Sequence, residues 1–237
     1  MITLADGDLS VDVFATGLDL GAARLGGQRF SWRSHDGERG LMFTCGLGNV
    51  GLASEGQPQH GWYRTLPAQD VETERNAARG RVVDGALELT RAITVANGVV
   101  RVADVVRNTG DATEPALLLY HVNFLWDTVA TDADEVVPRD DDARAGDWRE
   151  AGPPGAERVY EHVGATRATV GFGAIQAGVR SSLPRLWQWI DPSLGVLGIE
   201  PANCSVLGRA HDRADGRLPT LQPGESRSSW VEIAVAA

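Results

Sequence analysis

Alternation of apolar and polar residues, interrupted by short turn sequences, is the feature of this chain that most limits its fold. Asp6-Gly7 lies between two short strand-like runs, and Asn97-Gly98 lies between two longer ones. Both dipeptides accept the backbone angles of tight hairpin turns. The sequence shows no long apolar stripe at helical spacing. The pattern therefore predicts an all-β fold of stacked antiparallel sheets.

Further strands are expected wherever apolar alternation is bounded by Gly, Pro and Asp clusters. These strands are predicted at residues 116–126, 158–163, 167–179, 185–190, 194–200 and 229–235. Residues 127–157 are different, because they are acidic, rich in Asp, Gly and Pro, and show little alternation. We expect a long loop there, either closing over a ligand or forming a solvated charged segment. Without a repeat or a change in composition, residues 1–237 are predicted to form a single domain.

Composition excludes several functional classes. All 22 basic residues are Arg, which excludes Schiff-base, pyridoxal-phosphate and P-loop chemistry because each needs a lysine. The net charge of −10 disfavours binding to nucleic-acid phosphates. The N-terminal sequence lacks a signal-peptide pattern, and no run of 18 apolar residues occurs. We therefore expect a cytoplasmic protein with no membrane or nucleic-acid partner, whose cysteines, Cys45 and Cys204, are reduced thiols.

Two polar segments interrupt strongly apolar strands. His121 and Asn123 share one face of the strand at 116–126, and a buried polar side chain without a partner costs about 1–3 kcal/mol. Glu200 ends another apolar strand, and Glu is rarely buried without a partner. The pairing of His121 and Asn123 on one face therefore indicates a polar pocket, and burial of Glu200 at the end of an apolar strand suits a general base or acid. The structural alternatives are a core histidine bonded to a carbonyl group and an exposed glutamate at a strand end.

A third polar segment, residues 57–69, is expected to be a loop because it contains Pro58 and Gly61. It presents His60 and Arg64 beside two aromatic residues. Aromatic faces can stack on the C–H faces of a sugar ring, and a guanidinium group can bond its hydroxyls. The loop is therefore a candidate sugar-binding segment, with an ordinary surface turn as the alternative.

The order and spacing of these segments resemble those of the aldose 1-epimerase, or galactose mutarotase, superfamily. PQHGWYR (58–64) is similar to the PQHGFAR-type loop of hexose-phosphate mutarotases. YHVNF (120–124) resembles the HxYFN-type strand of aldose 1-epimerases, and GIEPANC (198–204) resembles the segment that carries their basic glutamate. LWQWIDP (186–192) resembles the aromatic stretch that precedes this glutamate in the hexose-phosphate branch. The resemblance implies a galactose mutarotase-like β-supersandwich.

Within this superfamily the chain is most similar to an aldose-epimerase-like family classed as a domain of unknown function. The similarity is carried by TGLDLGAARLGG (16–27), TCGLGNVG (44–51), GRAHDRADGRL (208–218) and LQPGES (221–226). The resemblance implies an enzyme that interconverts sugar anomers without a cofactor or metal, acting on a small-molecule sugar as a monomer or homodimer.

The resemblance also implies roles for individual residues. Glu200 would remove the proton of the anomeric hydroxyl, and His121 would protonate the ring oxygen. His60 would hold or polarise the sugar near that oxygen. The implied substrate-binding residues are Arg64, Asn123, Trp187, Trp189, Arg209 and Asn49.

Two other functions remain open. His60, His121, Glu200 and His211 include the ligand types that suit Zn²⁺ or Mn²⁺, which would favour isomerase or lyase chemistry on a keto-sugar. No tight HxH or HExxH spacing supports such a site. The seven Trp residues could instead serve a non-catalytic carbohydrate-binding protein.

Overall fold

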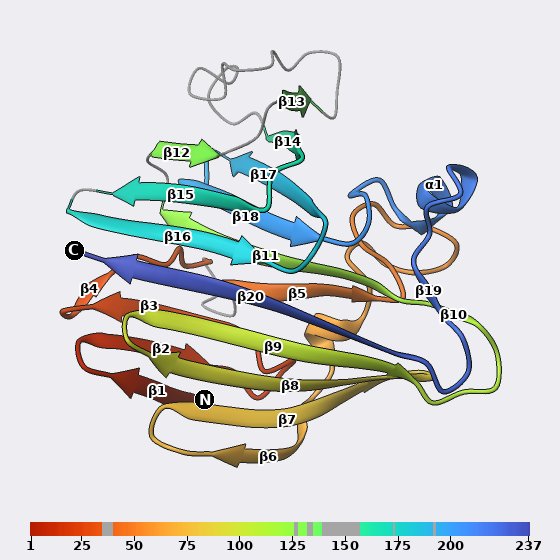
Figure 1. Cartoon of the computed structure of the whole chain (residues 1–237), viewed down its shortest axis with the longest axis horizontal. Coiled ribbons are helices and arrows are strands. Elements are labelled where there is room, and N and C mark those ends of the chain that lie inside the picture. Colours follow the sequence, from red (N-terminus) through yellow and green to blue (C-terminus); the bar gives the residue numbers. More distant parts are fainter. Residues whose placement is uncertain (35–39, 126–127, 132–134, 139–156, 173, 192) are drawn as a thin grey trace.

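Two large antiparallel sheets face each other in the computed structural model, which describes the chain except residues 35–39, 126–127, 132–134, 139–156, 173 and 192 (Figure 1). The ten-stranded sheet consists of β1 (Ile2–Asp6), β2 (Leu9–Val13), β3 (Leu20–Leu25), β5 (Met42–Leu47), β11 (Leu117–Leu125), β18 (Val196–Ala202), β17 (Arg185–Asp191), β14 (Arg158–Val163) and β13 (Glu135–Pro138) in this order, with β4 (Gln28–Arg29) paired to β3.

The eight-stranded sheet lies in front of the first in Figure 1. Its strands, in order, are β12 (Thr128–Thr131), β15 (Arg167–Phe172), β16 (Ile175–Ser181), β20 (Ser226–Ala236), β9 (Val99–Asn108), β8 (Leu87–Ala96), β7 (Ala77–Asp84) and β6 (Gln69–Thr73). The smaller elements are the pair β10 (Glu114–Pro115) and β19 (Thr220–Leu221), the 3₁₀ turn η1 (Tyr63–Thr65) and the helix α1 (Arg209–Ala214). No helix among the described residues is long and apolar enough to cross a membrane.

The predicted all-β fold and both predicted hairpins are confirmed. β1 pairs with β2 around Gly7, and β8 pairs with β9 around Asn97 and Gly98. Asn97 and Gly98 have φ angles of 51° and 76°, in the left-handed region that a two-residue hairpin turn requires. The predicted strand at 167–179 is instead two strands, β15 and β16, which pair antiparallel.

The prediction of one continuous loop at 127–157 is wrong for its first part. β12 pairs with β15, and β13 pairs with β14, so this part of the chain contributes one strand to each large sheet. Residues 139–156 lie outside the described part of the chain.

The main core lies between the two sheets, and β11 is buried on both of its faces. Leu118, Tyr120 and Val122 point toward the eight-stranded sheet and belong to this core. Leu117 and Leu119 point the other way, into a second apolar cluster. We call this second side of the ten-stranded sheet the outer face. The second cluster also contains Phe43, Cys45, Val50, Val159, Trp187, Ala202, Cys204 and Val206.

Loops, rather than another sheet, cover the outer face. Gly51 and Leu207 form an isolated β-bridge, which joins the loop after β5 to the loop after β18. Cys45 and Cys204 are buried beneath these loops, and burial raises the pKa of both thiols. These loops leave part of the outer face open, and the candidate site lies there.

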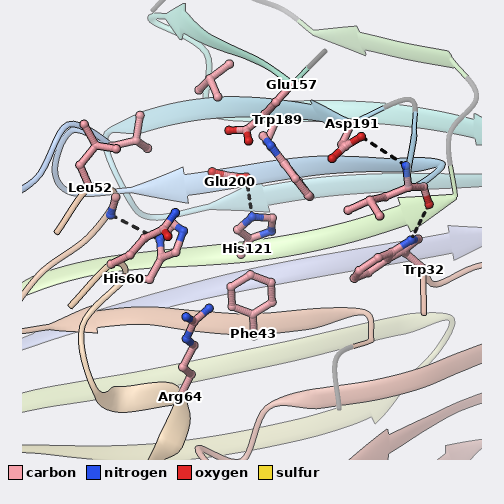
Figure 2. Close-up of a pocket in the computed structure, with 15 residues that line it drawn as sticks. Trp32, Phe43, Leu52, His60, Arg64, His121, Glu157, Trp189, Asp191 and Glu200 are labelled. Carbon is pink, nitrogen blue, oxygen red and sulfur yellow. Dashed lines mark hydrogen bonds and ion pairs between the residues drawn. The ribbon is translucent and has the colours of Figure 1, made fainter. Parts of the chain in front are cut away.

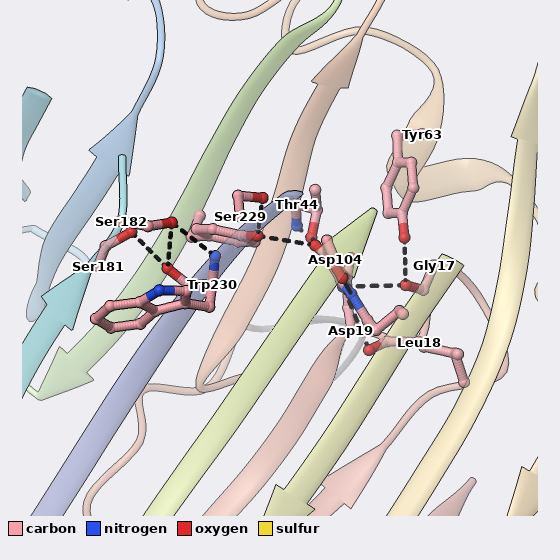
Figure 3. Close-up of polar contacts among 12 residues, drawn as sticks. Gly17, Leu18, Asp19, Thr44, Tyr63, Asp104, Ser181, Ser182, Ser229 and Trp230 are labelled. Carbon is pink, nitrogen blue, oxygen red and sulfur yellow. Dashed lines mark hydrogen bonds and ion pairs between the residues drawn. The ribbon is translucent and has the colours of Figure 1, made fainter. Parts of the chain in front are cut away.

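A buried ion network joins the two sheets beneath this face (Figure 3). Arg91 of β8 is fully buried and donates hydrogen bonds of 2.9 and 2.7 Å to the two carboxylate oxygens of Asp104. It also donates to Thr44 of β5 at 2.8 Å and to Asp19 at 3.2 Å. Tyr120 of β11 donates to Asp104 at 3.0 Å. The network therefore fixes β5 and β11 relative to the eight-stranded sheet.

Candidate active site

A cavity of about 330 Å³ opens on the outer face of the ten-stranded sheet (Figure 2). Its floor is formed by side chains from the central strands β5, β11, β17 and β18. Its walls come from the loops before β5, after β5 and between β17 and β18. This volume lies at the lower end of the range for small-molecule sites in proteins.

Strand register places a histidine and a glutamate side by side on the floor. The pairs Leu119 with Ala202 and Val122 with Ile199 set the alignment of β11 and β18. This alignment puts His121 opposite Glu200. Both side chains stand on the outer face, where His121 is 5% and Glu200 is 3% exposed.

His121 and Glu200 form a close contact, with Nε2 of the imidazole 2.9 Å from Oε1 of the carboxylate. Phe43 on β5 is the register partner of His121 and stacks on its imidazole, with the two ring centres 4.2 Å apart. The Trp189 ring meets the imidazole edge-on, with ring centres 5.2 Å apart. The two aromatic rings therefore hold the imidazole in one orientation. Nδ1 of His121 is buried and has no hydrogen-bond partner among the described residues. A buried polar atom of this kind is costly in a structural core but common where a ligand binds.

His60 lies on the wall beside this pair, and its ring centre is 6.3 Å from that of His121. The backbone N–H of Gly51 donates to Nδ1 of His60 at 3.4 Å, so the neutral ring carries its proton on Nε2. His60 and Gly61 have φ angles of 64° and 72°. A Cβ atom at position 61 would lie 2.3 Å from the carbonyl oxygen of Gly46, so only glycine fits where this loop crosses β5.

The rest of the wall includes Arg64 from η1, and also Trp32, Glu157 and Asp191, which were not selected from the sequence. The indole N–H of Trp32 donates to the carbonyl oxygen of Leu194 at 3.0 Å, which ties the loop before β5 to the turn after β17. The site therefore combines a buried histidine–glutamate pair, a second histidine and two indole groups.

A protein-family model matches most of this chain. Residues 36–235 match the family model described as "Domain of unknown function (DUF4432)". The chain belongs to this family. No curated protein matches it in sequence.

Solved structures with the same fold are galactose mutarotase-like. A candidate aldose 1-epimerase of Escherichia coli K12 superimposes with a TM-score of 0.80 at 17% identity, over 99% of this chain and 98% of that one. A candidate aldose 1-epimerase of Klebsiella pneumoniae gives 0.82 at 21%, over 98% and 78%. A galactose mutarotase-like protein of Lactobacillus casei gives 0.75 at 13%, over 100% of both chains. The DUF4432 chain therefore has the predicted galactose mutarotase-like β-supersandwich.

Asn49 and Arg209, expected to bind substrate, instead hold the covering loops together. The Asn49 amide donates to the carbonyl oxygens of Leu52 and Pro58, each at 2.9 Å, and accepts from the backbone N–H of Arg209 at 2.9 Å. The Arg209 guanidinium pairs with Glu55 at 2.7 Å. Neither residue lines the cavity of the DUF4432 chain.

Asn123 and Trp187 also lie outside the cavity lining. The Asn123 amide donates to the carbonyl oxygens of Gly40 at 3.2 Å and His121 at 3.0 Å, so it anchors the segment before β5 to β11. The Trp187 indole donates to the carbonyl oxygen of Cys204 at 3.1 Å and is 4% exposed. Their side chains support the site from within the protein. Trp189, His60, His121, Glu200 and Arg64, the other residues expected to act on or bind the sugar, do line the cavity.

Of the four residues of the metal alternative, His60, His121 and Glu200 line the cavity, but His211 does not. His211 lies in α1, where Nδ1 is 3.6 Å from a carboxylate oxygen of Asp215. Among the residues that the structure describes, no group of three or more His, Cys, Asp or Glu is arranged to hold a metal ion.

Proposed function

We propose that this DUF4432 protein is an aldose 1-epimerase-like mutarotase that interconverts the anomers of a small sugar. The observation that carries the proposal is the 2.9 Å contact between Nε2 of His121 and Oε1 of Glu200 on the floor of a cavity of about 330 Å³. A carboxyl group and an imidazole side by side can serve as the base and the acid of a proton-transfer reaction. We further propose that it works in the cytoplasm, as a monomer or homodimer.

The reaction needs two proton transfers in each direction. Glu200 accepts the proton of the anomeric hydroxyl while His121 donates a proton to the ring oxygen, and the bond between C1 and the ring oxygen breaks. Rotation about the C1–C2 bond of the open aldehyde exposes the other face of the carbonyl group. Closure then returns one proton to His121 and takes one from Glu200, so the enzyme ends as it began. Each positioned transfer contributes typically about 10²–10⁴ in rate.

The remaining wall residues have roles in holding the sugar. Trp32 and Trp189 offer aromatic faces for the C–H groups of a pyranose ring. His60, which carries its proton on Nε2, can donate a hydrogen bond near the ring oxygen. Arg64 can donate to hydroxyl groups, and Asp191 can accept from them.

The test is exchange NMR, which measures the rate at which the protein interconverts α and β anomers across a panel of neutral, acidic and phosphorylated aldoses. We expect Glu200→Gln and His121→Ala each to lower this rate by roughly 10²–10⁴-fold. His60→Ala is expected to raise KM more than it lowers kcat. His211→Ala is the matched control, because this histidine lies outside the cavity, and it should keep the wild-type rate.

Sugar binding is measured in the same samples by calorimetry. Glu200→Gln protein that still binds but no longer exchanges anomers supports catalysis by the pair. Wild-type protein that binds a sugar without accelerating exchange for any aldose would show a binding protein and overturn the proposal.

A further inference from the structure

Gly198 lies on β18 beside three residues of the site, Glu200, His121 and Trp189. Its register partners are Asn123 on β11 and Trp189 on β17. A Cβ atom built on Gly198 would lie 2.8 Å from Oε1 of Glu200, 3.1 Å from Cε1 of His121 and 3.3 Å from Cβ of Trp189. Its φ angle is outside the left-handed region, so the backbone alone would accept alanine. The requirement for glycine at this position is therefore one of space.

The geometry points to Gly198 as a positioning residue that sets the contact between Glu200 and His121, an inference that rests on the proposed mutarotase function. Side chains two residues apart on a strand share a face, so the Glu200 carboxylate occupies space that a side chain at position 198 would fill. A methyl group there would displace the carboxylate, the imidazole, or both. The reacting groups would then no longer be 2.9 Å apart.

Gly198→Ala is expected to lower kcat roughly 10- to 100-fold, because displacing a catalytic group by a fraction of an ångström has effects of up to about this size. KM should change less, since His60, Arg64 and Trp32 come from other segments and are not displaced by the new methyl group. A general loss of folding would also lower the apparent kcat at unchanged KM, so the folded fraction of each variant is measured by tryptophan fluorescence and kcat is expressed per folded protein.

Gly178 provides a matched control. It lies inside β16 of the eight-stranded sheet, its φ is also outside the left-handed region, and no heavy atom lies within 4 Å of the Cβ atom that alanine would add. Gly178→Ala therefore measures the effect of adding a methyl group to a strand glycine away from the site. It should leave kcat and KM unchanged.

Two further measurements test whether Gly198 acts through Glu200. In a Glu200→Gln background, Gly198→Ala should change the residual exchange rate less than about twofold, because the contact between carboxylate and imidazole that it would break is already gone. The ¹⁵N chemical shifts of the His121 imidazole should change in Gly198→Ala protein and stay unchanged in Gly178→Ala protein.

The inference is overturned if Gly198→Ala keeps the wild-type kcat, if its effect is equally large without the Glu200 carboxylate, or if the His121 signals stay unchanged. The NMR readout does not depend on activity. A wild-type protein inactive on every sugar would therefore refute the proposed function, while the His121 signals would still decide whether Gly198 positions the pair.

Discussion

Asp19 should make the stability of the protein depend on pH in an unusual direction. It is buried in the ion network, where it shares Arg91 with Asp104. Burial raises the pKa of Asp19 from 3.8 to about 6, although Arg91 and hydrogen bonds from Thr44 favour the charged carboxylate. One guanidinium group faces two carboxyl groups, so ionising both leaves an excess negative charge in the core.

The sign follows from proton binding. The folded protein binds the Asp19 proton more tightly than the unfolded chain does, so this contribution to stability is fully present below about pH 4 and is lost as pH rises through about 6. The whole change corresponds to about 3 kcal/mol in the free energy of unfolding. Between pH 5 and pH 7 the expected loss is about 1 kcal/mol.

Asp19→Asn removes the titrating group and keeps an oxygen that can accept hydrogen bonds from Thr44 and Arg91. Urea unfolding, followed by tryptophan fluorescence, would be measured for wild type and variant at pH 5 and pH 7. The wild type should lose about 1 kcal/mol relative to the variant over this interval. The reasoning would be refuted if the difference in the free energy of unfolding between wild type and variant were the same at both pH values, or if the wild type gained stability relative to the variant at pH 7.

Two further substitutions distinguish a residue that stabilises the covering loops from one that is proposed to contact the sugar. Asn49→Ala removes the bonds to Leu52 and Pro58 that hold the covering loop, so the free energy of unfolding should fall by about 1–3 kcal/mol in urea titrations. Trp32→Phe keeps an aromatic face but loses the bond to Leu194, so KM in the anomer-exchange assay should rise by up to about tenfold while kcat changes little.

The fold was largely predictable because alternation and turn chemistry are local. Asn97 and Gly98 specified their hairpin by backbone preference alone. The strand predicted at 167–179 was split because the buried positions change phase, from Ala168 and Val170 to Ile175 and Ala177, and such a change marks a turn. That signal was present in the sequence.

The contact between His121 and Glu200 could be anticipated for a different reason. His121 and Glu200 are polar residues in strongly apolar strands, so each needed a partner, and strand register makes them partners of each other. Asn49 was misassigned because residue type does not reveal whether an amide bonds a ligand or a backbone carbonyl. Trp32 was missed because its place in the wall depends on a bond to Leu194, which is distant in sequence.

The anomer-exchange rate of wild-type protein compared with Glu200→Gln, on the sugar that the wild type uses best, tests the proposed catalytic pair most directly. The buried contact with His121 predicts a fall of roughly 10²–10⁴-fold, with sugar affinity retained. A Glu200→Gln variant that exchanges anomers at the wild-type rate would contradict it.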